Sequence, residues 1–129
     1  KELLEKNKSI ASKIKILGQL DFNKVKDYLN NSSLFLFAST CENLPFIVLE
    51  AISYGLPVIT TDKMPMKGIV AGQNIFFDSL DIESIKTIIK DNLNEEKLNK
   101  ISQLNYLNSK NYKWKTNVIQ TINYLKSIA

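Results

Sequence analysis

The sequence contains no histidine and no arginine, and Cys41 is its one cysteine. Without histidine, the Ser-His-Asp and Cys-His arrangements of nucleophilic catalysis are excluded, and so are zinc sites of the usual Cys and His composition. A single cysteine excludes a disulfide within the chain, so we expect a reducing compartment. Without arginine, no guanidinium can clamp a phosphate, and any bound phosphate would depend on backbone amides and lysines.

Long apolar runs are also absent. None reaches the roughly 18 residues that a transmembrane helix needs, and no signal peptide opens the chain. We therefore expect a cytoplasmic protein with no transmembrane segment. Because the chain begins with Lys1 rather than Met, we expect it to be a piece of a longer protein.

The charge of the chain is basic but dispersed. Seventeen lysines against 13 acidic residues give a net charge of +4. The lysines are scattered as on solvated helix faces, whereas a nucleic-acid-binding module usually clusters its charge among aromatic residues. We therefore expect no nucleic-acid partner. The 129 residues, 44% of them hydrophobic, suit one domain with a substantial core.

The first third of the chain predicts two helices and a strand. The lysine-rich residues 1–8 are typical of the end of a helix. Apolar residues alternate with lysines over residues 13–17, which predicts a strand that stops at Gly18. Asp21 is a suitable N-cap for a helix that ends near Asn30. The apolar residues expected on one face of that helix are Phe22, Val25 and Leu29.

A strand, a helix and a second strand follow. Residues 34–38 are apolar on both faces, which is typical of a buried parallel strand. We expect the helix to begin near residues 43–44, with Pro45 in its first turn, where the missing N–H costs nothing. This helix is apolar nearly all round, which predicts that it is buried, and Gly55 ends it as a left-handed cap. Residues 57–60 open the next strand.

The last part of the chain is mostly helical. Strands that alternate with helices predict an α/β fold, in which helices flank a parallel, Rossmann-like sheet. We expect one domain over residues 1–129. The remaining expected elements are a loop with a short helical piece at 61–73, a strand at 75–77, and helices at about 82–91, 95–109 and 113–128.

The final expected helix is apolar on one side. Its apolar residues are Trp114, Val118, Ile122 and Leu125. Trp114 has two open interpretations, a core residue or a platform on which a base stacks. We favour the core, because tryptophan on an apolar stripe usually belongs to one.

Two carboxylates bracket the apolar stretch that contains Pro45. Glu42 lies just before the predicted helix and Glu50 lies about two turns inside it, which places them roughly 10–12 Å apart. Residues 38–44 form the loop at the carboxyl end of a strand, where open parallel sheets bind ligands. The first free amides of the helix, near Leu44, Phe46 and Ile47, make an anion site suited to a diphosphate.

Carboxylates accept hydroxyl protons well, so Glu42 and Glu50 could bind the two sugar rings of a nucleotide sugar, one on each side of its phosphates. The alternative is that Glu42 caps a loop while Glu50 extends into solvent from a packed helix. Ser39 and Thr40 either contact phosphate or form hydrogen bonds with the backbone groups at the end of the strand. Lys63 and Lys67 are possible phosphate contacts, and we interpret Cys41 as a small buried filler.

At these residues the sequence resembles the group 1 (family 4) glycosyltransferases, in the C-terminal, donor-binding half of their two-domain GT-B architecture. The most specific segment is a glutamate-x7-glutamate signature at 42–51, followed by a Gly-x-Pro-Val segment at 53–59. The resemblance covers essentially the whole chain. Its other segments are residues 16–18, 25–29, 33–39, 80–85 and 111–114.

This resemblance implies a retaining transfer of a sugar from a nucleotide-diphosphate donor, with no obligatory metal and no other cofactor. It implies that Glu42 contacts the donor sugar near the reacting centre and that Glu50 contacts the ribose. It also implies that residues 43–46 hold the diphosphate and that the base lies near residues 18–20. The implied donor-binding residues are Gly18, Gln19, Leu20, Ser39, Thr40, Asn43, Leu44, Pro45, Phe46 and Glu50.

The chain departs from the family's pattern in two places. Gly68 stands where the family usually has a glutamate before Ile-Val, and the family's Arg…Lys pair would lie upstream of Lys1. The acceptor-binding half would also lie upstream, so we expect this piece alone to be inactive. The resemblance suggests a glycan or lipid-linked acceptor in cell-surface polysaccharide synthesis, with peripheral association at the inner face of the membrane. The alternatives are a non-catalytic nucleotide-sugar-binding subunit completed by a partner chain and a sugar-nucleotide epimerase of similar fold.

Overall fold

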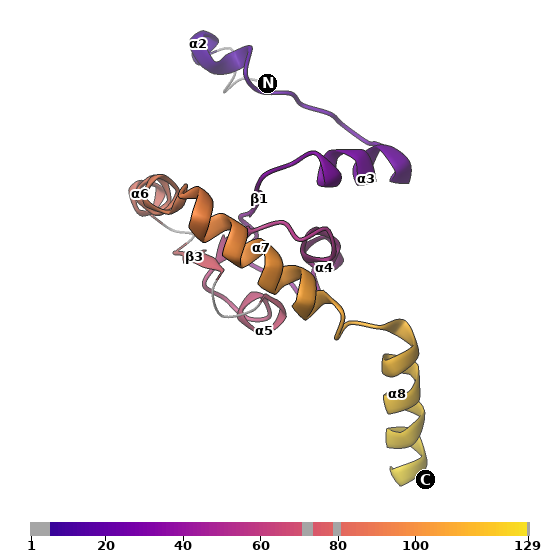
Figure 1. The fold of residues 1–129 in the computed structure, drawn as a ribbon. Coiled ribbons are helices and arrows are strands. Elements are labelled where there is room, and N and C mark those ends of the chain that lie inside the picture. Colours follow the sequence, from indigo (N-terminus) through magenta and orange to yellow (C-terminus); the bar gives the residue numbers. More distant parts are fainter. Residues whose placement is uncertain (1–5, 71–73, 79–80, 129) are drawn as a thin grey trace.

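The computed structural model describes residues 6–70, 74–78 and 81–128, and helices alternate with strands along its central part (Figure 1). The strands are β1 (Phe35–Phe37), β2 (Val58–Thr61) and β3 (Ile75–Phe77). The helices are α2 (Lys8–Ala11), α3 (Phe22–Asn30), α4 (Phe46–Ser53), α5 (Met66–Ile69), α6 (Ile82–Asn92), α7 (Glu95–Ser109) and α8 (Trp114–Ile128).

The three strands form a parallel sheet in the order β1-β2-β3. Successive residues of β2 point to opposite faces, and each face has its own apolar cluster. Val58 packs with residues of α3, α4 and α5, whereas Ile59 packs with residues of α6 and α7. A parallel sheet with helices on both faces confirms the predicted α/β, Rossmann-like fold.

Helix ends follow the predicted local signals. Asp21 caps α3, because its Oδ1 accepts a hydrogen bond from the Lys24 N–H (3.0 Å). That bond, the largest cause, holds the pKa of Asp21 below its ordinary value. Gly55 follows α4 with φ +73°, in the left-handed region that favours glycine. A Cβ at Gly55 would also lie 3.3 Å from Ser102 Oγ on α7, which is a tight contact, so any other residue here would be strained by its φ and would press on Ser102.

A buried pair of asparagines joins the amino edge of the sheet to α7. Asn105 is fully buried, and its Nδ2 donates to the Leu56 carbonyl (2.8 Å) and to Asn74 Oδ1 (2.9 Å). The Asn74 amide donates in return to Asn105 Oδ1 (2.7 Å), and the Val58 N–H donates to Asn74 Oδ1 (3.0 Å). Four polar groups that burial would otherwise leave unpaired are therefore satisfied together.

One expectation for the N-terminal third was wrong. Residues 13–17 belong to no strand: Lys13 lies in a turn, residues 14–17 have no regular secondary structure, and the apolar side chains of the segment are exposed. A strand needs a neighbour for its hydrogen bonds, and no described residue pairs with this segment. Gly18, where the strand was expected to stop, has φ +65°, in the left-handed region that favours glycine. The helix end expected over residues 1–8 falls mostly on residues 1–5, which lie outside the described residues. Lys6 is helical, and a separate short helix, α2, begins at Lys8.

The burial of three apolar segments was also predicted wrongly. Phe22 of α3 is exposed, although Val25 and Leu29 do pack in the core. In β1, Leu36 is half exposed, because the cluster that covers its face reaches Leu34 but not Leu36. Helix α4 packs through the buried Val48, Ala51 and Ile52 and the partly buried Leu49, whereas Phe46 is 65% exposed on its other side. The apolar composition of these three elements therefore led us to expect more of their side chains to be buried by neighbouring residues than the structure shows.

Helix α8 has the predicted bounds but not the predicted burial. Each of its residues is exposed, and Trp114, expected in the core, is 80% exposed. Figure 1 shows α8 (yellow) extending away from the sheet and its covering helices. No described helix is long and apolar enough to cross a bilayer.

We predict that Asn105→Leu lowers the free energy of unfolding by about 3 kcal/mol, because it removes the donor to the buried Leu56 carbonyl and both hydrogen bonds to the Asn74 side chain. Urea unfolding followed by circular dichroism measures the change. Asn99→Leu, at an exposed position of the same helix, is the matched control and should change stability by less than about 0.5 kcal/mol. Equal midpoints for the two variants would contradict the structural role of the asparagine pair.

Candidate functional site

The carboxyl ends of the three parallel strands meet at one edge of the sheet, and hydrogen bonds tie the loops there together. Thr61, the last residue of β2, donates from Oγ1 to the Ser39 carbonyl just after β1 (2.8 Å). The Asp62 N–H donates to the Phe77 carbonyl at the end of β3 (2.9 Å). These bonds hold the loop before α4 beside the loop that follows β2.

Helix α4 begins at this edge without a side-chain cap. Pro45 is its N-cap residue and makes no capping bond, and its carbonyl accepts from the Val48 N–H (3.0 Å). Among hydrogen bonds between described residues, none has the N–H of Phe46 or Ile47 as donor. The free amides and the helix dipole therefore present a positive end, as predicted for an anion site.

The other long helices whose N-caps are known differ from α4. Helices α3, α6 and α7 each begin with an acidic or amide side chain, from Asp21, Asp81 and Asn94, that accepts a backbone N–H of the first turn. Their first amides are therefore partly occupied by the chain itself. The N-terminus of α4 is the one among these four whose positive end is open to a ligand.

The start of α4 corrects the predicted geometry of the acidic pair. Because the helix begins at Phe46 rather than near residues 43–44, Leu44 precedes it and Glu50 lies about one turn inside it, not two. Glu50 shares the exposed side of α4 with Phe46 and Ile47, opposite the buried face. Glu42 lies in the preceding loop and is partly buried. Neither carboxylate forms a hydrogen bond or ion pair with another described residue, so both can accept hydroxyl groups of a ligand.

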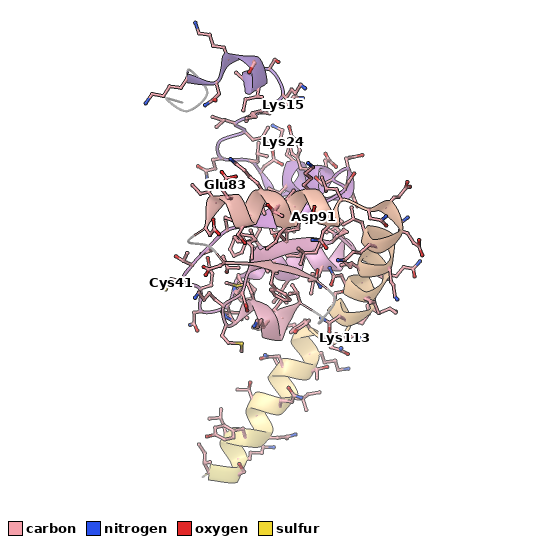
Figure 2. All side chains as sticks on the ribbon, turned by 90° about the vertical axis from the view of Figure 1, so that its left-hand side faces the viewer. Lys15, Lys24, Cys41, Glu83, Asp91 and Lys113 are labelled. Atoms are coloured by element: carbon pink, nitrogen blue, oxygen red, sulfur yellow. The ribbon has the colours of Figure 1, made fainter. Side chains whose placement is uncertain are left out.

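The loop between β1 and α4 holds the remaining candidates of this edge. Ser39 is partly buried, and its Oγ donates to the Cys41 carbonyl (3.5 Å), while Thr40 and Asn43 are exposed. Cys41 is exposed, so its interpretation as a buried filler was wrong (Figure 2). Its short side chain points outward because the loop has left the sheet by this position.

The candidate base-binding residues belong to a segment away from the loops at the carboxyl edge of the sheet. Gly18, Gln19 and Leu20 belong to the segment between α2 and α3, and no hydrogen bond between described residues joins them to the α4 N-terminus. Figure 1 shows that segment leading away from the sheet toward α2. Their role in binding the base stays a prediction.

The loop after β2 contributes two residues that the sequence did not single out. Thr61 fixes the Ser39 carbonyl, and Asp62 pairs with Lys67. Their position directly after a strand, at the edge where parallel sheets bind ligands, is the signal that could have found them. Lys67, a candidate phosphate contact, is therefore paired with Asp62, whereas Lys63 is exposed and no ion pair with a described residue involves it.

Among the described residues, no three Cys, Asp or Glu side chains gather as a metal site.

A hollow of about 500 Å³ lies at the opposite, amino edge of the sheet. Ser33 and Pro57, which precede β1 and β2, line it together with Leu98 and Ser102 of α7. It shares no lining residue with the loops around α4's N-terminus.

Comparison with known proteins gives the family and the fold. The family described as glycosyl transferases group 1 matches residues 1–114. A sucrose-phosphate synthase of Thermosynechococcus elongatus superposes with a TM-score of 0.85 over 98% of this chain, at 15% identity, and this chain covers 33% of it. That likeness establishes a GT-B type of fold.

Two curated relatives have similar sequences over shorter stretches. A putative teichuronic acid biosynthesis glycosyltransferase of Bacillus subtilis is 40% identical over 47 residues, which is 36% of this chain. A glycosyltransferase of Haemophilus influenzae is 32% identical over 65 residues, which is 47% of this chain. The matches span 12% and 18% of the lengths of these relatives.

We predict that Thr61→Val lowers the free energy of unfolding by about 1 kcal/mol, because the Ser39 carbonyl loses its donor. Thr60→Val is the matched control on the same strand. Thr60 is equally buried, but its Oγ1 has no hydrogen-bond partner in the described part of the chain, so valine should leave stability unchanged or raise it. Thermal unfolding measures both variants, and equal losses would contradict the bond between the two loops.

Proposed function

The chain belongs to the group 1 glycosyl transferases, and from that premise we propose that it forms the donor-binding half of a GT-B glycosyltransferase. The activity we propose is retaining transfer of a sugar from a nucleotide-diphosphate sugar to an acceptor. One observation carries the proposal: the N-terminus of α4, which no side chain caps, lies at the carboxyl edge of the sheet, and in the sequence it falls between Glu42 and Glu50. The family match favours this proposal over a sugar-nucleotide epimerase.

The diphosphate of the donor would bind at the N–H groups of Phe46 and Ile47. A backbone amide and the helix dipole bind a phosphate oxygen without a guanidinium, which this chain could not supply. Lys63, on the neighbouring loop, could add a positive charge near the phosphates. We extend this contact to Ser39, Thr40 and residues 43–45, which belong to the loop before α4.

The two carboxylates would bind the sugar rings. Glu42 precedes the helix end and would contact the donor sugar near its reacting carbon, whereas Glu50, on the exposed side of α4, would accept hydroxyl protons from the ribose. As the bond to the diphosphate breaks, negative charge grows on the departing oxygens. Donors already aimed at that charge stabilise the transition state more than the substrate. We propose that this arrangement needs no obligatory metal.

The acceptor and its surroundings come from the proposed second half of the enzyme. The curated relatives are several times longer than their matches to this chain, which supports a two-domain protein in which residues 1–129 are one unit. We propose a glycan or lipid-linked acceptor, as in the synthesis of cell-surface polysaccharide, and a cytoplasmic enzyme. The 129 residues alone should show no turnover, because they lack that half.

We predict that Glu50→Gln weakens the binding of a nucleoside diphosphate sugar to this chain about tenfold, because a neutral amide accepts the ribose hydroxyl protons less strongly. Calorimetry with a panel of uridine, guanosine and adenosine diphosphate sugars measures the affinity. Glu96→Gln, at an exposed position at the start of α7, is the control and should leave the affinity unchanged. If the two variants bound equally well, Glu50 would have no part in the site.

In the full-length enzyme, Glu42→Gln should lower turnover about a hundredfold while the affinity for the free nucleoside diphosphate stays the same, since Glu42 is assigned to the sugar. Wild-type turnover in this variant would remove Glu42 from the reacting centre.

A further inference from the structure

The hollow at the amino edge of the sheet lies apart from the diphosphate site and has a lining of its own. It lies between the residues that precede β1 and β2 on one side and the first half of α7 on the other, and we call it the amino-edge hollow. The buried Leu56 and Pro57, which lead into β2, belong to its lining. Its volume of about 500 Å³ falls within the range of about 300–1,000 Å³ that is usual for small-molecule sites.

One face of α7 is turned toward this hollow. Glu95, Leu98, Asn99 and Ser102 line it, and their spacing of three or four residues places them on the same side of the helix. The helix is fixed to the sheet, because the buried asparagine pair joins it to the amino edge and Leu98 packs against the core. The amino-edge hollow therefore has a fixed wall of polar and apolar side chains.

Most of the polar side chains in the lining are available to a ligand. No hydrogen bond between described residues involves the side chains of Ser33, Glu95, Asn99 or Ser102. Ser32 differs, because its Oγ donates to a carbonyl of α3 (2.6 Å). The unpaired groups are two hydroxyls, a carboxylate and an amide, which together offer donors and acceptors. A ligand with several hydroxyl groups would use both kinds.

The charge of the lining narrows the class of ligand. Among the described residues that line the hollow, Glu95 is the one charged side chain, so an anion would be repelled and would find no lysine. A metal ion needs several oxygen ligands, which a lone carboxylate does not provide. A wholly apolar ligand would remove water from Glu95 and Asn99 without replacing the hydrogen bonds that water makes.

A neutral sugar ring satisfies both the polar and the apolar part of the lining. Its hydroxyl groups can donate to Glu95 and exchange hydrogen bonds with Asn99. Its C–H groups can cover the apolar side chains of Leu56 and Pro57 and the ring of Tyr54. Pockets of this kind, mostly apolar with a few polar groups that fix orientation, are typical of small-molecule sites.

We propose that the amino-edge hollow binds a neutral sugar unit, at the opposite edge of the sheet from the diphosphate site. The hollow shares no lining residue with the loops around the N-terminus of α4, so both sites can be filled at once. In the proposed transferase, the sugar unit belongs to the glycan that is being extended, and the hollow holds that glycan away from the place of transfer. Only this last step rests on the proposed function, because the sugar site follows from its own lining.

Amide nuclear magnetic resonance on the ¹⁵N-labelled chain tests the site with free sugars as probes. Glucose and N-acetylglucosamine, each titrated alone, should shift the N–H groups of Ser33, Gly55 and Ser102, which belong to the lining. The N–H groups of Phe46 and Ile47 should stay in place. A separate titration with uridine diphosphate reports on Phe46 and Ile47, so failure of the sugar site and failure of the proposed function are distinguishable.

Glucuronate tests the charge of the hollow, because it carries a carboxylate on a ring that otherwise matches glucose. It should bind roughly tenfold more weakly than glucose, since Glu95 repels it. In the Glu95→Gln variant, glucose and glucuronate should bind alike. Glu96→Gln is the matched control, because this neighbouring carboxylate of α7 does not line the hollow, and the preference for glucose should remain.

Asn99→Leu tests the hydrogen bonds of the hollow and should weaken the binding of glucose about tenfold. Asn99 is exposed, so the domain should stay folded, which circular dichroism checks. The proposal would be overturned if neither neutral sugar shifted the N–H groups of Ser33, Gly55 and Ser102. Equal binding of glucose and glucuronate by the unaltered chain would also overturn it, and so would an unchanged affinity for glucose in the folded Asn99→Leu variant.

Discussion

The candidate site depends on the parallel pairing of β1 with β2, because this pairing brings the carboxyl ends of the strands to one edge of the sheet. Had the strands been antiparallel, the loop before α4 and the loop after β2 would lie at opposite ends. The bond from Thr61 to the Ser39 carbonyl then fixes the two loops against each other. Helix α4 starts from this fixed loop with its first amides unoccupied, which is what a phosphate group requires.

The polar side chains at the two edges of the sheet differ in their hydrogen bonding. At the amino edge, Asn74 and Asn105 satisfy each other and the neighbouring backbone, so that α7 is locked onto the sheet. At the carboxyl edge, the carboxylates of Glu42 and Glu50 make no bond to another described residue. A rigid amino edge and unpaired groups at the carboxyl edge are what a binding site on a fixed scaffold needs.

The sequence predicted those parts of the structure that local chemistry decides. The cap at Asp21 and the left-handed Gly55 set the ends of their helices, and both were expected. The start of α4 was misplaced, because proline loses no hydrogen bond either at the N-cap or in the first turn. The strand expected at 13–17 and the burial expected for Trp114 failed for another reason: periodicity shows which side chains are apolar but not which surface covers them. The pairing of Glu42 with Glu50 was predicted from spacing and stays a prediction, whereas the contact from Thr61 to the next loop depends on the fold.

The central claim is that the open N-terminus of α4 binds a diphosphate, and amide nuclear magnetic resonance on the ¹⁵N-labelled chain tests it most directly. On titration with a nucleoside diphosphate, the account predicts the largest shifts at the N–H groups of Phe46 and Ile47. The first amides of α3 and α7, which Asp21 and Asn94 already occupy, should move little. Shifts spread over lysine-rich surfaces, with none at Phe46 and Ile47, would contradict the account.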